Sequence, residues 1–256
     1  MPDLAPVQRL SVPDAVADQL QQQILGGQLP AGDDLPSERR LAEVLGVSRP
    51  TVREALRQLQ QRGLVAIRQG GATTVRDFRR SAGLDLLPQL LLSGDGLDLA
   101  LVRDVMRARS AIAPTLARAA AEESSRRAAD GAAADRALLE AAEALPATED
   151  PVEQQHRSLA FWDAVVDRSG SMVFRLLFNG LRAAFEPGLP ALAGVLQVEA
   201  GHPSAALDVA QAIVDGRPDA AEAAADAMLA RGRDAVLALL DQLDPPGSAS
   251  TDEEPT

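Results

Sequence analysis

A short stretch, GVSRPTVREAL at residues 46–56, carries two arginines, Arg49 and Arg53, four positions apart. Residues with this spacing lie on one face of a helix. A guanidinium is a planar fork that can donate two hydrogen bonds to the edge of a guanine in the major groove of DNA. Ser48 and Thr51 stand at the predicted helix start, where hydroxyls and free backbone N–H groups suit phosphate oxygens. These residue types therefore predict the binding of a polyanion, in a chain whose formal net charge is -12.

The charge of the chain is segregated along the sequence. Residues 35–80 hold ten arginines against four acidic residues, a net charge of +6. Residues 1–34 sum to -4, and residues 81–256 carry -14. A basic segment joined to an acidic one is the charge pattern expected of a nucleic-acid-binding module attached to a second domain.

The elements around the arginines predict a helix-turn-helix. A helix with apolar residues at spacing four begins at residue 12 and is stopped by Gly26 and Gly27. Ser37 is the expected N-cap of the next helix, Gly46 ends that helix, and Ser48 caps the one that follows. The last helix directs four apolar residues toward a core, namely Val52, Ala55, Leu56 and Leu59. Two β-branched runs, LVAIR and TTVRDF, are joined by QGGA and predict a hairpin, so the module is expected to be a winged helix.

The stretch LPSERRLAEVLGVSRPTVREALRQLQQRGLVAIRQGG resembles the N-terminal winged helix of GntR-family bacterial transcription regulators. The resemblance covers about residues 10–77 and implies sequence-specific binding of double-stranded DNA. It also implies the residues that contact DNA, with the last two at the wing tip: Arg39, Ser48, Arg49, Thr51, Arg53, Gln69 and Gly70. Pro50 occupies a position where some members carry a hydroxyl residue, which removes one possible phosphate contact.

The rest of the chain is predicted to be helical, so the expected fold is mainly α with a small β-hairpin wing. We expect a DNA-binding domain at 10–77, a polar linker at 78–83, an all-helical ligand-sensing and dimerisation domain at 84–243, and a disordered acidic tail at 244–256. Helical patterns cover residues 84–93, 97–123, 126–145, 152–168, 171–186, 203–216 and 218–243. The stripe predicted for the helix at 97–123, which contains Pro114 as an expected kink, is Leu101, Val105, Ala108, Ile112 and Leu116.

The helical half resembles the FCD-type ligand-sensing domain of the FadR subfamily. By that resemblance a metal is held by an aspartate, a histidine four residues later and two further histidines. This chain has only two histidines, His156 and His202, and carries Ser158 and Trp162 where the first two metal ligands would be. Ala206 and residues 229–231 occupy the places of the other two. We therefore expect neither a metal nor any other cofactor.

Several stretches, among them VMRARSAI and FRLLFNGLRAAFEP, are similar to the metal-free branch of that subfamily, which responds to fatty acids or acyl-coenzyme A. Such a ligand needs an apolar tunnel for its tail and cations for its phosphates. The candidate ligand-binding residues are Val105, Arg109, Ile112, Phe161, Trp162, Phe178, Arg182, Arg217 and Arg231. Two alternatives stay open, a small carboxylate metabolite as effector and a ligand-independent DNA-binding dimer.

The predicted protein is a homodimer that binds a palindromic operator and a small-molecule effector. The chain contains no cysteine, and neither a Ser-His-Asp set nor a carboxylate pair stands out in residues 84–243, so we do not expect an enzyme. The N-terminal residues lack the pattern of a signal peptide and no apolar run is long enough to span a membrane, which predicts a cytoplasmic protein without a membrane partner.

Overall fold

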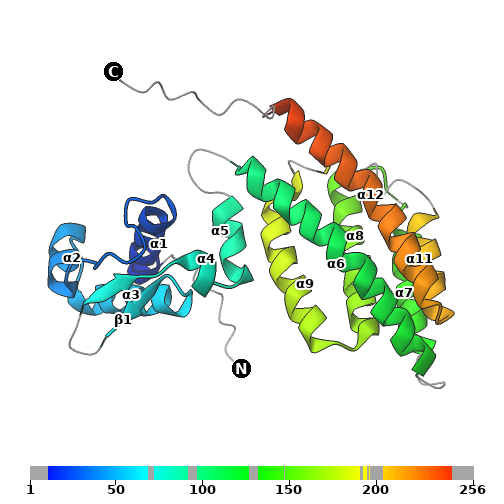
Figure 1. Ribbon diagram of the computed structural model, residues 1–256, viewed down its shortest axis with the longest axis horizontal. Coiled ribbons are helices and arrows are strands. Elements are labelled where there is room, and N and C mark those ends of the chain that lie inside the picture. The colour runs from blue at the N-terminus through cyan, green and yellow to red at the C-terminus, as the bar shows by residue number, and fades with distance from the viewer. Residues whose placement is uncertain are drawn as a thin grey trace, which may run out of the picture. The chain divides into compact units, whose positions relative to one another are not determined.

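The computed structural model describes residues 11–68, 72–91, 97–126, 132–146, 148–190, 193–194, 196 and 204–243. The chain divides into two compact units, Met1–Leu97 and Asp98–Thr256. Helices dominate both units, and a two-stranded antiparallel sheet lies in the first (Figure 1). The predicted fold class, a small winged helix-turn-helix followed by an all-helical half, is confirmed.

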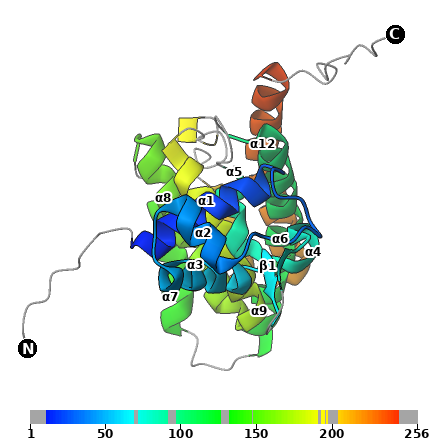
Figure 2. The ribbon, with the colours of Figure 1, turned by 90° about the vertical axis from the view of Figure 1, so that its left-hand side faces the viewer.

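In its described residues, the first unit has three helices and a hairpin, followed by short helical turns (Figure 2). Its elements are α1 (Val12–Leu25), α2 (Glu38–Leu45), α3 (Arg49–Gln61), β1 (Val65–Ile67), β2 (Thr73–Val75), α4 (Phe78–Ser81), the 3-10 turn η1 (Leu84–Leu86) and α5 (Leu87–Leu91). Val65 pairs with Val75 in the hairpin. The core forms where the predicted apolar face of α3 packs on α1, and Val52, Ala55 and Leu59 are fully buried there.

The end of the first unit differs from the predicted domain boundary. Residues 78–83 were expected to be a linker, and residues 84–93 a helix of the second domain. Instead, α4 covers Phe78–Ser81, and the hydroxyl of Ser81 donates to the carbonyl of Gly63 at 2.7 Å. Leu86 joins the apolar core of the winged helix at 2% exposure. The reason is that the side chains of Phe78 and Leu86 pack against this core. The polar composition of the segment, on which the predicted linker was based, does not show this packing.

The second unit is an all-helical bundle. Its elements are α6 (Leu99–Arg126), α7 (Ala132–Ala144), α8 (Pro151–Ser169), α9 (Met172–Phe185), the 3-10 turn η2 (Glu186–Gly188), α11 (Ala205–Val214) and α12 (Pro218–Leu243). The helix α6 continues through Pro114. Alanines of α6 and α12, including Ala117 and Ala225, are fully buried, and such small side chains let two long helices approach closely.

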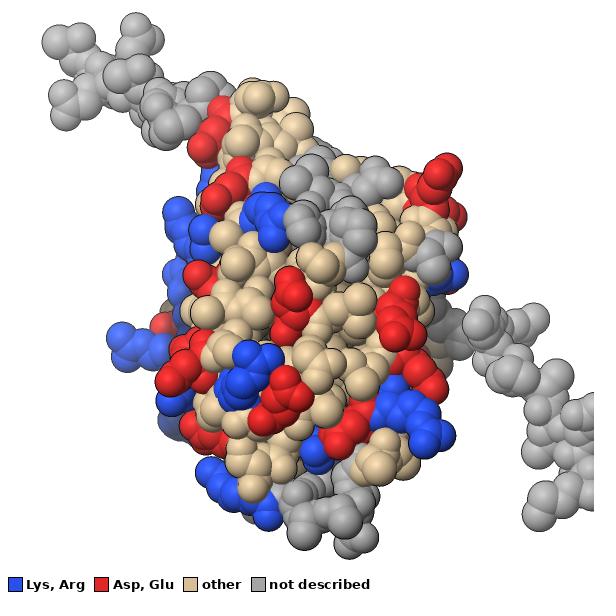
Figure 3. Space-filling model, turned by 90° about the vertical axis from the view of Figure 1, so that its right-hand side faces the viewer, with Lys and Arg blue, Asp and Glu red and all other residues tan. Residues whose placement is uncertain are grey.

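Arginines of the second unit lie beside carboxylates on the face of the molecule shown in Figure 3. On α6, Arg118 donates to Asp219 at 2.6 Å and to Glu222 at 2.8 Å, both on α12. These carboxylates raise the pKa of Arg118. Carboxylates of the acidic half thus balance some of its arginines locally.

Candidate nucleic-acid interface and internal pocket

Two serine caps and one glycine fix the ends of α2 and the start of α3, as the sequence predicted. The hydroxyl of Ser37 accepts from the backbone N–H of Arg40 at 3.3 Å, and Gly46 ends α2 with φ of 66°. The hydroxyl of Ser48 accepts from the backbone N–H of Thr51 at 3.3 Å and lies 2.8 Å from the Thr51 hydroxyl. Both hydroxyls therefore stand at the exposed start of α3, where backbone N–H groups are free to meet an anion.

The arginines of α3 do not share one environment. The guanidinium of Arg53 donates to both carboxylate oxygens of Glu38 on α2, at 2.8 to 3.3 Å. These hydrogen bonds hold the pKa of the Glu38 carboxyl below its usual range. Arg57 pairs with Glu54 at 3.3 Å. Arg49 is exposed and makes neither a hydrogen bond nor an ion pair with any residue that the structure describes.

The predicted DNA-contacting residues that are described lie on α2 and at the first turns of α3. Arg39 pairs with Glu43 at 2.7 Å, and its side chain is 71% exposed. Exposed ion pairs of this kind contribute only about 0–1 kcal/mol, so a phosphate or a base edge can replace the carboxylate. The other two predicted contacts, Gln69 and Gly70, lie outside the described residues. Glu38 was not predicted as the partner of Arg53, because a contact between two helices leaves no mark in helical periodicity.

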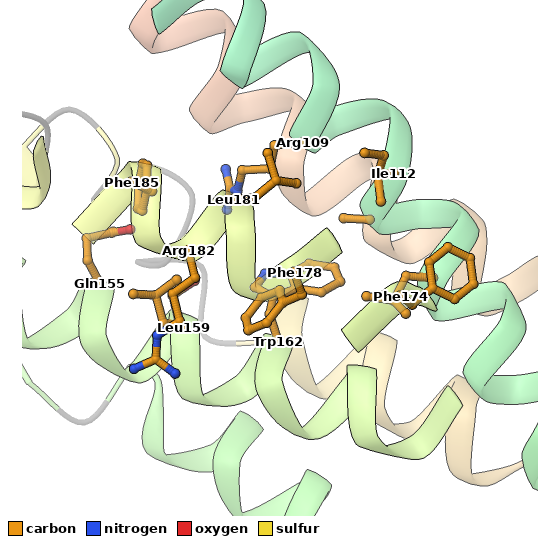
Figure 4. A pocket seen from close by; sticks show the side chains of 13 residues that line it. Arg109, Ile112, Gln155, Leu159, Trp162, Phe174, Phe178, Leu181, Arg182 and Phe185 are labelled. Carbon is orange, nitrogen blue, oxygen red and sulfur yellow. The ribbon is translucent and has the colours of Figure 1, made fainter. Parts of the chain in front are cut away.

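A pocket opens in the second unit between α6, α8 and α9 (Figure 4). Its cavity measures about 70 Å³, and the space around it is partly open to solvent. The walls consist of Arg109, Ile112, Ala113 and Leu116 from α6, Gln155, Ser158, Leu159 and Trp162 from α8, and Phe174, Phe178, Leu181, Arg182 and Phe185 from α9.

Polar groups interrupt this largely apolar lining at a few points. The guanidinium of Arg109 lies over the ring of Phe185, 6.0 Å from its centroid. Arg182 donates to Glu186 at 2.8 Å. On α8, the amide nitrogen of Gln155 and the indole nitrogen of Trp162 are buried without a hydrogen-bond partner among the described residues. The arrangement suits an amphipathic ligand, with an apolar body and groups that accept hydrogen bonds or carry negative charge.

The pocket includes five of the nine predicted ligand-binding residues, namely Arg109, Ile112, Trp162, Phe178 and Arg182. The other four do not line it. Val105 and Phe161 are buried among neighbouring helices. Arg217 pairs with Asp215 at 3.0 Å, and Arg231 donates to the carbonyl of Ala227 on its own helix. Sequence reasoning missed Gln155, Phe174 and Phe185, because the residue type of each was equally consistent with a surface or a core position.

The positions that the resemblance assigns to metal ligands lie in two places. Ser158 and Trp162 line the pocket, and both are 4% exposed. Ala206 and Leu229 are buried in the bundle core. His156 is exposed on α8, and His202 lies outside the described residues. Within the described part of the chain, no three His, Asp or Glu side chains gather in a way that could hold a metal ion.

The absence of a structural metal stays a prediction, and chelation tests it. A bound metal stabilises the native state by mass action, so its removal lowers the melting temperature. We expect excess EDTA to leave the melting temperature of the purified protein unchanged, as measured by differential scanning fluorimetry with a mock-treated sample as control. A drop of several degrees would show that residues other than the family's ligands hold a metal.

Two family models match the chain. The model of bacterial regulatory proteins of the gntR family matches residues 13–75, and the FCD domain matches residues 104–231. The chain belongs to the GntR family. The HTH-type transcriptional regulator Mce2R of Mycobacterium tuberculosis is 47% identical over 237 residues, which are 93% of this chain and 96% of the relative. This GntR protein is therefore a DNA-binding transcription regulator of the FCD type.

Two more distant comparisons agree with this assignment. A fatty acid metabolism regulator protein of Shewanella frigidimarina is 34% identical over 157 residues, 61% of this chain and 62% of the relative. A solved structure of Lar, which controls expression of the Listeria monocytogenes agr system, covers 92% of this chain and all of its own with a TM-score of 0.55. At 14% identity that structure supports the GntR fold alone. Among the described helices of this GntR protein, none is long and apolar enough to cross a membrane.

Proposed function

We propose that this protein senses an acyl-coenzyme A or a fatty-acid derivative in the pocket between α6, α8 and α9, and that the bound ligand changes its affinity for operator DNA. The observation that carries the proposal is the composition of the pocket. Three phenylalanines of α9 and aliphatic residues of α6 face one space, with Arg109 and Arg182 in its walls. Such a lining suits an apolar tail attached to an anionic group. The fatty acid metabolism regulator among the relatives supports the same ligand class.

The proposed regulator acts as a homodimer on a palindromic operator, with Arg49 and Arg53 of each subunit at a half-site. An exposed apolar surface on α9 supports association with a second copy. Met172, Val173 and Leu176 lie there with 62 to 69% of their surface exposed. A ligand shifts the operator affinity only by binding one state of the dimer better than the other. Since α9 forms both this surface and a wall of the pocket, it is the element through which a ligand reaches the dimer.

The test is fluorescence anisotropy of labelled promoter DNA from the protein's own gene. We expect a medium- or long-chain acyl-coenzyme A to release the protein from this DNA, and free coenzyme A to have no effect. Tight binding that is indifferent to acyl-coenzyme A would contradict the proposal. The effector would then be sought among small carboxylates, or the bundle would be a ligand-independent dimerisation domain.

A charge variant locates the effect in the pocket. Arg109→Gln removes a cation from the wall, so roughly 10- to 150-fold more acyl-coenzyme A should be needed for release, since a hydrogen bond to a charged group contributes about 1.5–3 kcal/mol. The matched control is Arg107→Gln on the same helix, because Arg107 pairs with Asp104 outside the pocket and is 65% exposed. If both variants need the same concentration of acyl-coenzyme A for release from DNA, the ligand binds outside this pocket.

A further inference from the structure

One wall of the pocket presents unused hydrogen-bond donors. Gln155, Ser158 and Trp162 lie at intervals of three and four residues, which places them on one face of α8. All three line the pocket, and each is at most 4% exposed. The amide nitrogen of Gln155 and the indole nitrogen of Trp162 make no hydrogen bond with any described residue.

Buried donors of this kind are more stable when an acceptor is present. Most buried polar groups in proteins are hydrogen-bonded, and an unpaired one costs free energy. An indole N–H can only donate, so the missing partner of Trp162 has to be an acceptor. The side chains that line the pocket around it are mostly apolar and supply none, among them Ile112, Leu116, Leu159, Phe174 and Phe178. A ligand in the pocket can supply this acceptor.

We propose that Gln155 and Trp162 make the pocket select a ligand that carries an oxygen acceptor, a carbonyl or a carboxylate, inside its otherwise apolar body. This inference rests on the proposed function, because it takes an acyl-type molecule as the occupant. The two donors lie at different positions along the axis of α8, since seven residues of helix span roughly 10 Å. In Figure 4, Gln155 lies toward the end marked by Phe185, and Trp162 lies near the middle of the pocket.

The proposal differs from selection by charge alone. If the arginines alone chose the ligand, removal of an α8 donor would leave the ratio of the ketone and hydrocarbon affinities unchanged. If the α8 donors act, the ketone binds better than the hydrocarbon, although neither carries a charge. Replacing a donor by an apolar isostere then removes the preference for the ketone and leaves the hydrocarbon unaffected.

The experiment compares three probes of matched length, decanoate, methyl nonyl ketone and undecane, on the full-length protein. Trp162 is the only tryptophan of the chain, so its fluorescence reports on the pocket without a label. Competition with a pocket-bound fluorescent fatty acid measures the affinity of each probe for the variants Trp162→Phe and Gln155→Met. These variants place an apolar side chain at each position and remove the donor. Phe178→Leu is the control, because it alters the wall without touching a donor and should weaken all three probes alike.

We expect the unaltered protein to prefer the ketone over undecane, and at least one donor variant to reduce that preference roughly 3- to 10-fold, the range for a neutral hydrogen bond. An unchanged preference in both variants, with acyl-coenzyme A still releasing DNA, would overturn this inference and leave the proposed function intact. A preference that the variants abolish, without any release of DNA by acyl-coenzyme A, would support the inference and contradict the proposed function. Failure of all three probes to bind would overturn both.

Discussion

Replacing Arg49 with alanine should weaken specific binding to the operator roughly 5- to 100-fold, the range for losing one bidentate contact to a base. Among the arginines of α3, Arg49 is the one that could contact DNA without first leaving a carboxylate, since Arg53 is bound to Glu38 and Arg57 to Glu54. It also lies at the first position of the helix, next to the Ser48 cap. We therefore expect its loss to remove a base contact without disturbing the fold.

The measurement is a titration of operator and of scrambled DNA by fluorescence anisotropy at fixed salt, because phosphate contacts make all such affinities depend on salt. The operator affinity should fall much more than the affinity for scrambled DNA. Arg126→Ala serves as the control, because it removes the same charge from an exposed position on α6. Sedimentation velocity should show the same dimer for all three proteins. Equal losses on both DNAs would mean that Arg49 contacts phosphate and does not read a base.

The local elements of the winged helix could be predicted because their signals are short-range. Ser37, Gly46 and Ser48 fix the ends of two helices through bonds to residues at most four positions away. Arg53 and Glu38 lie fifteen residues apart in the sequence, so no local pattern predicts their pairing. The same holds for the end of the winged-helix domain, which depends on the burial of the Leu86 side chain in the core of that domain.

The pocket was predictable only in part, for a related reason. The stripe predicted along α6 assumed one buried face, but Leu101, Ala108 and Ile112 are only half-buried. The helix packs on α12 with one side and faces the pocket with another, where Ile112 lies. A residue that lines a cavity and a residue that fills a core have the same apolar character. Only the position of α9 in the folded protein shows which residues of α6 line the pocket.

Gly63→Ala should be the most destabilising of the changes considered, at about 2–5 kcal/mol, from a left-handed alanine and an overpacked contact together. Gly63 follows α3 with φ of 76°. A Cβ atom there would clash with the carbonyl oxygen of Ser81 and would lie 3.2 Å from the Cα of Ala82. Both are backbone atoms, so relief requires α4 to move away from the turn.

Gly46→Ala is the matched comparison. Gly46 has φ of 66°, yet a Cβ atom there meets nothing within 4 Å. It should therefore cost only the left-handed conformation, about 1–2 kcal/mol. Scanning calorimetry of the full chain measures both variants, and the transition that operator DNA raises identifies the unit that contains them.

The difference between the two variants reports on α4. If Gly63→Ala melts well below Gly46→Ala, the segment 78–82 is a packed part of the winged helix, held against the turn by the bond from Ser81 to Gly63. Equal melting temperatures would mean that this segment yields without cost and acts as the linker that its polar sequence predicted. Because α4 follows directly after the wing, the comparison of the two variants tests whether the winged-helix domain extends beyond residue 77.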